Sequence, residues 1–275
     1  MPISYIILPL LFILMMILYL KFKNYVPILM YHRIAKVTGD RNSLPAEKFE
    51  EQLRYLAENN FTTITPDMLY NYYVNRVPLP KKSVLLTFDD GYADNYTKAL
   101  PLLLKYKMTA VVFPIGNWIG KPNHWENFGK KETTTMTLAQ LKAWQKNDMQ
   151  IEVHTLNHPF LNNCSQSKLE EELFNSKKLF ENLLAKPMNY LCYPYGCFNQ
   201  KVIDTAKRAG YKMAFAIFEN VPLWKIDLFA LPRIPIPAHQ KMWEFKLKVS
   251  SIHIIFIALR KWERKFKHLK HKLKT

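Results

Sequence analysis

The chain has 275 residues, of which 49% are hydrophobic and 22% are charged, so a large folded core is expected and a globally disordered chain is not. Its three cysteines, Cys164, Cys192 and Cys197, are too few for a disulfide framework or for a zinc site built of thiolates. The formal net charge of +17 favours anionic neighbours, namely nucleic acid, membrane lipid or an anionic substrate.

The first segment, residues 3–20, is an apolar run without a charged side chain. As a helix it would span roughly 27 Å, which is close to the hydrocarbon thickness of a bilayer, and Pro9 is tolerated in a membrane helix. A cleaved signal peptide is the alternative, and the lack of Lys or Arg before the run and of small residues after it disfavours that reading. We therefore expect residues 1–24 to form a single transmembrane anchor. The lysines and arginines that follow favour a cytoplasmic main domain.

Between residues 25 and 250, short apolar runs alternate with amphipathic segments. The runs expected to form strands are 27–31, 61–64, 83–88, 109–113, 151–153, 189–193 and 212–217. The segments expected to form helices are 47–59, 65–73, 92–105, 137–145, 167–185 and 199–210. Apolar strands separated by helices are typical of a parallel sheet with helices outside. This number of units favours a closed or nearly closed β/α barrel over an open sheet.

The last segment, residues 251–275, is expected to form a basic amphipathic helix. Trp262, Phe266, Leu269 and Leu273 fall on one helical stripe, and lysines and arginines lie between them. Such a helix typically lies on anionic lipid. A solvated helix packed on the domain and a nucleic-acid-binding helix are the alternatives. Because an apolar segment already opens the chain, we expect anionic membrane lipid as a partner and no nucleic acid.

Polar side chains gather at the C-terminal ends of four expected strands. They are His32, Asp89, Asp90, His154, His158 and Tyr195. In a parallel barrel these strand ends meet on one face, where the active sites of such barrels are built. Taken singly, an Asp in such a place is more often a helix cap or turn former, and a lone histidine is more often structural. Their coincidence at matching strand ends favours one shared site.

Histidines and carboxylates in this combination suit a metal centre. Two His and one carboxylate hold a catalytic metal and leave positions open for water and substrate, and the metal acidifies water and polarises a carbonyl. A dication beside Asp90 would offset its repulsion with Asp89, which is then a candidate general base. His32, from another strand end, could protonate a leaving group. This donor set accepts Zn²⁺, and also Co²⁺ or Ni²⁺.

At these residues the sequence resembles the polysaccharide deacetylases, the NodB-homology carbohydrate esterases. The resemblance covers residues 25–240 and rests on TFDDGYADNY (87–96), HTLNHPFL (154–161) and YPYG (193–196). The stretches ILMYHRI and LFALPRIPI resemble the circularly permuted branch, which includes poly-N-acetylglucosamine deacetylases. The resemblance implies an α/β fold, a distorted barrel of seven or eight β/α units, for a catalytic domain that we place at residues 25–250.

The resemblance also implies a role for each site residue. Asp89 would be the base, His32 the acid, and the backbone N–H of Tyr195 an oxyanion donor. The implied ligands of a divalent metal, most often Zn²⁺, are Asp90, His154 and His158. The implied reaction is hydrolysis of an N-acetyl or similar N-acyl group on an amino sugar.

One position departs from the family pattern. Many members have an arginine that contacts the base at the place of Cys192 in this chain. We expect Arg233 to substitute for it and to tune the base.

Three functions fit these features. The first, which the family favours, is deacetylation of an N-acylated amino-sugar polymer outside the cytoplasm. The second is a deacetylase or deformylase of a polyprenyl-phosphate-linked amino sugar, which the apolar and basic chain ends and the charge bias favour. The third is a catalytically inactive carbohydrate-binding barrel, which the full set of Asp and His side chains disfavours.

Overall fold

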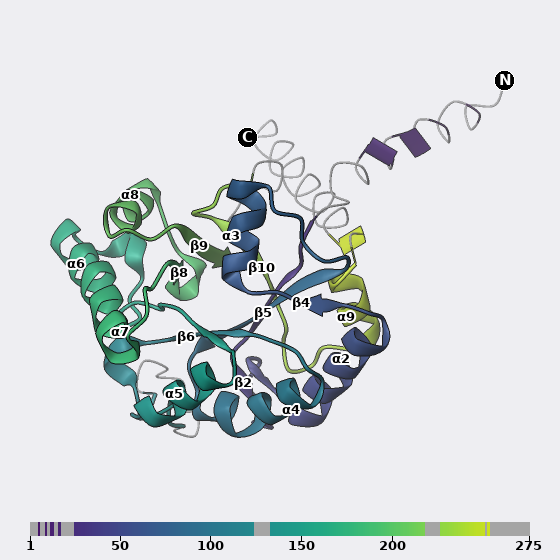
Figure 1. Cartoon of the computed structure of the whole chain (residues 1–275), viewed down its shortest axis with the longest axis horizontal. Coiled ribbons are helices and arrows are strands. Elements are labelled where there is room, and N and C mark those ends of the chain that lie inside the picture. Colours follow the sequence, from purple (N-terminus) through teal and green to yellow (C-terminus); the bar gives the residue numbers. More distant parts are fainter. Residues whose placement is uncertain are drawn as a thin grey trace, which may run out of the picture. The chain divides into compact units, whose positions relative to one another are not determined.

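The computed structural model places most of the chain (Figure 1). It describes residues 25–123, 133–217 and 226–250, with a few single positions nearer each end. The chain divides into two compact units, Ile28–Gln240 and the two ends, Met1–Pro27 with Lys241–Thr275. All of the expected site residues belong to the first unit.

Both expected membrane segments fall almost wholly outside the described residues. They are the anchor at 1–24 and the basic helix at 251–275. Among the residues that are described, no helix is long and apolar enough to cross a membrane.

The strands and helices follow the order expected from the sequence, with several additions. The strands are β1 (Ile28–Tyr31), β2 (Arg33–Ile34), β3 (Ser43–Leu44), β4 (Thr62–Thr63), β5 (Ser83–Asp90), β6 (Val111–Pro114), β7 (Gln150–Ile151), β8 (Tyr190–Cys192), β9 (Met213–Ile217) and β10 (Leu231–Pro235). The helices are α2 (Ala46–Glu58), α3 (Pro66–Asn75), α4 (Leu100–Lys105), α5 (Leu138–Lys146), α6 (Gln166–Glu170), α7 (Ser176–Leu184) and α8 (Gln200–Arg208), with α9 (Met242–Lys248) in the unit of the chain ends.

Within the described residues, one parallel sheet has the order β7-β6-β5-β1-β10-β9-β8, and β4 pairs with β5 outside this path. The two end strands meet, because a parallel bridge joins Val153, just after β7, to Leu191 in β8. There the N–H of Cys192 donates to the carbonyl of Val153 at 2.8 Å. The sheet is thus curled until its ends touch. The expected parallel, curled α/β architecture is confirmed.

The core lies where the helices pack on the outer side of this sheet (Figure 1). All eight residues of β5 are buried, as expected for a central parallel strand. Helix α2 buries Phe49, whose ring meets Tyr31 edge-on at 5.3 Å and Phe88 at 5.7 Å. Trp144 of α5 meets the Phe88 ring at 6.1 Å. These aromatic contacts fix the helices against β1 and β5, the strands that end in the site.

One of the seven expected strands, the run 61–64, does not form part of the ring. The run 61–64 contributes only the two-residue β4, which pairs with the start of β5 and is partly exposed. The ring contains instead a strand that was not expected, β10, which lies between β1 and β9. The sequence of β10, LPRIP, has two prolines and a charge, and such residues are poor strand signals because proline donates no ladder hydrogen bond.

Two expected helices contain a π turn. The helix expected at 92–105 begins with the π turn Asn95–Ala99, and the helix expected at 167–185 is interrupted by the π turn Glu171–Asn175. Such turns are rare and are frequent at functional sites. The second one contains a carboxylate, Glu172, that is fully buried.

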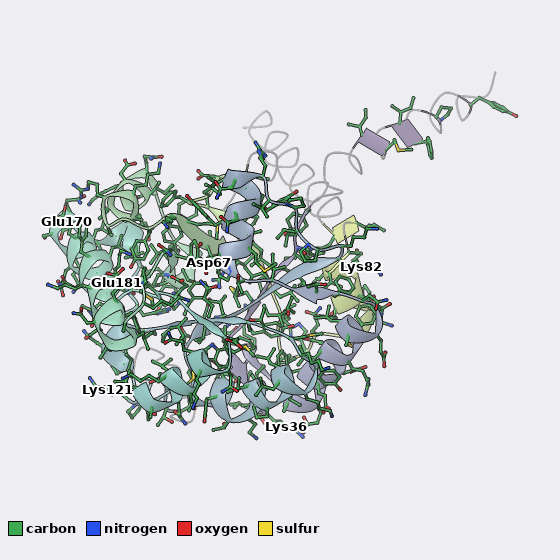
Figure 2. All side chains as sticks on the ribbon, viewed as in Figure 1. Lys36, Asp67, Lys82, Lys121, Glu170 and Glu181 are labelled. Atoms are coloured by element: carbon green, nitrogen blue, oxygen red, sulfur yellow. The ribbon has the colours of Figure 1, made fainter. Side chains whose placement is uncertain are left out.

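Some of the basic side chains are solvated surface groups. Lys36, Lys82 and Lys121 are exposed and lie at the periphery of the molecule (Figure 2). The positive charge of this unit is therefore carried in part by its outer surface.

Candidate active site

Asp89 and Asp90 are the last two residues of β5, and both are buried. Alternation along the strand sends neighbouring side chains to opposite sides. Asp90 also has a left-handed backbone, with φ of 68°, and Gly91 follows with φ of 70°. A Cβ on Gly91 would lie 2.8 Å from the Cβ of Pro114, so the tight turn requires glycine. The two adjacent carboxylates consequently face different partners.

Asp90 faces two histidines. Its Oδ1 lies 3.5 Å from Nε2 of His154 and 3.4 Å from Nε2 of His158. All three side chains are buried, and the three ligand atoms lie within 4.8 Å of one another. The structure thus brings together the three residues expected to hold a metal.

The two histidines differ in their protonation. His154 Nδ1 lies 2.8 Å from the carbonyl oxygen of Cys192, which accepts only if Nδ1 carries the proton. Burial lowers the pKa of His154, but Cys192 and the Asp90 carboxylate outweigh burial and raise the pKa well above its usual value, so a cation would have to displace the proton on Nε2. Burial lowers the pKa of His158 to about 3, so this ring is neutral at neutral pH.

The carboxylate of Asp90 and the two imidazoles form a set of atoms that suits a divalent cation. Asp90 Oδ1 is buried and accepts no hydrogen bond from the described residues. A buried carboxylate oxygen without a donor is costly. A cation between Asp90 and the two imidazoles would satisfy it, and two His with one carboxylate is a set found in catalytic zinc sites. The residues therefore fit such a metal.

The loop that carries His158 is held by a residue that the sequence did not single out. The N–H groups of Leu156 and Asn157 donate to Oε2 of Glu172 at 2.9 and 2.8 Å, and Asn157 Nδ2 donates to Oε1 at 2.8 Å. Within the loop, His158 N donates to Thr155 Oγ1 at 3.0 Å. Thr155 and His158 both have left-handed backbones, with φ of 66° and 61°. Glu172 therefore fixes a strained loop whose last residue faces Asp90.

Asp89 is paired with Arg233. The guanidinium donates through Nη1 to Oδ1 at 2.6 Å and through Nη2 to Oδ2 at 2.8 Å, and Arg233 is completely buried. Burial raises the pKa of Asp89, but the charge and hydrogen bonds of Arg233 outweigh it, so the pKa falls below its usual value. Asp89 is thus an ionised carboxylate in a fixed orientation. Cys192 donates its thiol to Oδ1 of the same carboxylate at 3.5 Å.

His32 lies on the open side of Asp89. Its Nε2 is 4.0 Å from Oδ2 of Asp89, and its side chain is 19% exposed. Its backbone is fixed by the π turn after β5, because Asn95 Nδ2 donates to the His32 carbonyl at 2.7 Å. Asp94 accepts from the N–H of Ile34 at 2.9 Å. The segment that carries both carboxylates therefore also positions the histidine expected to be the acid.

Tyr195 completes the rim of the site. Its φ is 57°, and Gly196 follows with φ of 64°, where a Cβ would lie 2.5 Å from Cγ1 of Ile217. The ring of Tyr195 meets the ring of His158 at 4.5 Å and 63°. The structure places this residue next to the Asp90 cluster, as the strand-end pattern predicts.

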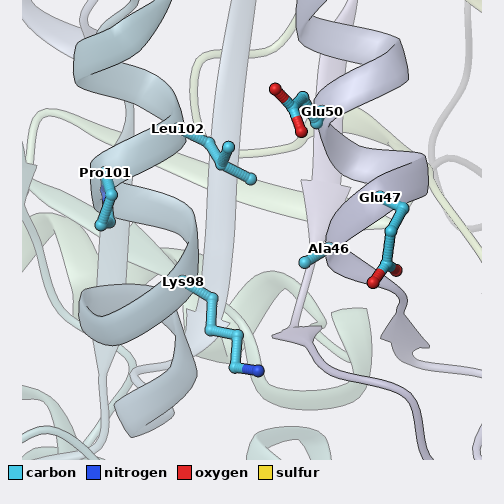
Figure 3. A pocket seen from close by; sticks show the side chains of 6 residues that line it. All are labelled: Ala46, Glu47, Glu50, Lys98, Pro101 and Leu102. Atoms are coloured by element: carbon cyan, nitrogen blue, oxygen red, sulfur yellow. The ribbon is translucent and has the colours of Figure 1, made fainter.

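A pocket of about 290 Å³ lies elsewhere, between α2 on one side and the π turn Asn95–Ala99 with α4 on the other (Figure 3). It is lined by Ala46, Glu47, Glu50, Lys98, Pro101 and Leu102. Glu50 is already paired there with Lys105, at 2.5 Å. The pocket includes none of the expected site residues, and we assign it no part in catalysis.

Sequence comparisons agree with this geometry. The family described as polysaccharide deacetylase matches residues 76–214. YxkH of Bacillus subtilis (strain 168), assigned as a polysaccharide deacetylase, is 33% identical over 210 residues, which cover 76% of this chain and 71% of YxkH. A poly-beta-1,6-N-acetyl-D-glucosamine N-deacetylase of Staphylococcus aureus (strain N315) is 28% identical over 237 residues, which cover 79% of this chain and 81% of the relative.

Solved structures share the fold. The deacetylase PplD of Streptococcus pyogenes, determined in complex with acetate, has a TM-score of 0.70 and 25% identity, covering 82% of this chain and 98% of PplD. IcaB from Ammonifex degensii has a TM-score of 0.70 and 23% identity, covering 82% of this chain and 97% of IcaB. With the family match across half of its length and a relative one-third identical, the chain belongs to the polysaccharide deacetylases and is a carbohydrate N-deacetylase, a hydrolase of non-peptide amide bonds.

Proposed function

We propose that this chain removes the N-acetyl group from N-acetylglucosamine units of a polysaccharide, with the help of a divalent metal. The observation that carries the proposal is the Asp90, His154 and His158 cluster beside the Asp89–Arg233 pair. The relatives named poly-beta-1,6-N-acetyl-D-glucosamine N-deacetylase support a polymer of this sugar as the substrate.

Asp90, His154 and His158 would hold the metal, with Zn²⁺ as the best fit and Co²⁺ or Ni²⁺ as substitutes. When bound, such a metal lowers the pKa of water and polarises a carbonyl oxygen. Asp89 takes the proton from the attacking water, and Arg233 keeps that carboxylate ionised and correctly oriented until it does so.

The remaining roles concern the amide that is cleaved. The backbone N–H of Tyr195 donates to the oxygen on which negative charge develops. His32, on the open side of Asp89, protonates the departing amine so that the C–N bond can break. Water thus adds to the acyl carbon, one proton passes to Asp89, and another passes from His32 to the amine, which gives acetate and the free amino sugar.

The test combines metal content with turnover. The purified protein is expected to contain about one divalent metal per chain and to release acetate from β-1,6-linked N-acetylglucosamine oligomers. Asp89→Asn removes the base and should reduce acetate release by at least about 100-fold. Asp148→Asn is the matched control, since Asp148 is exposed and lies outside the site. The proposal would be contradicted if the purified protein contained no metal, or if the Asp89→Asn variant were as active as the wild type.

A polyprenyl-phosphate-linked amino sugar is the second candidate substrate. The apolar run at 3–20 and the basic stripe at 251–275 favour it, because both features suit a protein held at a membrane surface. In this second proposal, residues 1–24 form a single membrane anchor and residues 251–275 contact anionic lipid. A topology reporter fused after Thr275 separates the two substrates, since a cytoplasmic readout excludes a secreted polymer.

A further inference from the structure

Two exposed aromatic rings lie directly beside the site. Phe160 and Tyr195 are stacked, with ring centroids 3.9 Å apart and an interplanar angle of 10°. Phe160 is 47% exposed and Tyr195 is 40% exposed. The ring of Tyr195 also meets the ring of His158 at 4.5 Å, so the stacked pair begins beside a residue proposed to hold the metal. We call these two residues the aromatic platform.

Local contacts hold the backbone on both sides of the aromatic platform. Phe160 caps the 3-10 turn Leu161–Asn163, and its carbonyl accepts from the N–H of Asn163 at 3.0 Å. Tyr195 is fixed in a left-handed conformation by the packing of Gly196 on Ile217. Neither ring fills the core, so the stack does not serve internal packing alone. Rings that are held in place and left exposed lose little conformational freedom when a partner covers them.

The chemistry around Phe160 suits a sugar. A pyranose ring has an apolar C–H face that covers an aromatic face, and its hydroxyl groups need hydrogen-bonding partners. The exposed side chains of Asn162 and Asn163 lie in the turn that Phe160 caps. An aromatic face with neighbouring amides therefore offers both kinds of contact to one pyranose unit.

We propose that Phe160 of the aromatic platform binds the sugar unit next to the one that is deacetylated, which makes the enzyme selective for an oligomer or polymer. The inference rests on the proposed function, and it specifies the substrate class. A lipid-linked single amino sugar has no neighbouring sugar unit to cover the ring. Phe160 is a specificity-determining residue in this scheme and takes no part in the chemical step.

The test compares chain lengths. Wild-type protein should deacetylate a β-1,6-linked N-acetylglucosamine pentamer with a lower KM than the monomer. Phe160→Leu keeps apolar bulk but lacks the aromatic face, so it should raise the KM for the pentamer about tenfold, much more than the KM for the monomer, and change kcat by less than about twofold. Phe160→Trp should preserve the wild-type KM. Phe174→Ala, which removes an exposed ring outside the site, is the control and should match the wild type.

The outcomes separate the inference from the proposed function. If the wild type deacetylates the pentamer and Phe160→Leu has the same KM, the inference is wrong and the function stands. A wild type that prefers a polyprenyl-phosphate-linked substrate and is insensitive to Phe160→Leu also overturns it. If no substrate is turned over, the proposed function fails, and calorimetric binding of the pentamer then tests the inference directly, because equal affinity of wild type and Phe160→Leu contradicts it.

Discussion

Arg233 holds both carboxylate oxygens of Asp89 from a strand that does not adjoin the strand of Asp89. Strand β1 lies between β10 and β5, and the guanidinium reaches across it with bonds of 2.6 and 2.8 Å. Arg233 Nη1 also donates to Thr87 Oγ1 at 3.2 Å. Because the pair is buried, removing one partner leaves the other charge without its counter-charge in a poorly solvated place.

Arg233→Lys should therefore impair catalysis more than it impairs folding. A lysine carries the charge but cannot donate to both oxygens in the fixed planar geometry, so we expect kcat to fall about 10- to 100-fold. Arg233→Ala leaves a buried carboxylate unpaired and should lower the free energy of unfolding by about 3–5 kcal/mol. Steady-state kinetics and urea unfolding measure the two effects. Arg208→Lys, in the exposed pair with Glu170, should change neither, and normal kcat in Arg233→Lys would contradict the role.

Metal removal should lower the stability of the folded state. A ligand that binds only the native state at 100 times its Kd stabilises it by about 2.7 kcal/mol. Treatment with a chelator is thus expected to lower the Tm of the wild type, and added Zn²⁺ should restore it. In His158→Ala, which lacks one of the three ligands, chelation should leave the Tm nearly unchanged. An equal Tm shift in both proteins would place the metal elsewhere.

Glu172 should control the metal affinity without touching the metal. It accepts three hydrogen bonds from the backbone and side chain of the loop that ends in His158. Glu172→Ala removes them and should weaken Zn²⁺ binding about 10- to 100-fold, as measured by competition with a chromophoric chelator. Glu171→Ala is the matched control, because Glu171 is a neighbour in the same π turn with a largely exposed side chain that pairs with Lys168. Unchanged affinity in Glu172→Ala would mean that the loop holds its own shape.

Gly196→Ala should destabilise the protein through both a steric clash and an unfavourable backbone conformation. A Cβ at Gly196 would lie 2.5 Å from Ile217, and the φ of 64° is itself unfavourable for alanine. We expect a loss of about 2–4 kcal/mol in the free energy of unfolding, together with displaced Tyr195 and reduced turnover. Gly39→Ala is the control, since its φ is 78° but nothing lies within 4 Å of the added Cβ. It should lose only the backbone contribution of about 1 kcal/mol, and equal losses in both variants would exclude the steric effect.

The alternation of apolar runs and amphipathic segments predicts most of the fold because each buried parallel strand leaves a local signature. The strand-end rule likewise predicts which side chains gather with Asp89 and Asp90. Strand β10 was not predicted from the sequence. Its two prolines and Arg233 are unusual in a buried strand, and its position depends on pairing with β1 and β9. Glu172 was not predicted because it is one of three consecutive glutamates, although its spacing of three from Leu169 and four from Ser176 puts it on the buried face of the helix.

The placement of β10 beside β1 has a consequence for biosynthesis. A chain emerging from the ribosome contains Asp90, His154 and His158 well before Arg233 is made, so the residues proposed to hold a metal precede the buried partner of Asp89. Until β10 inserts between β1 and β9, Asp89 lacks its buried counter-charge. The site around Asp89 is therefore complete only when the last strand of the sheet, β10, pairs with the first strand, β1.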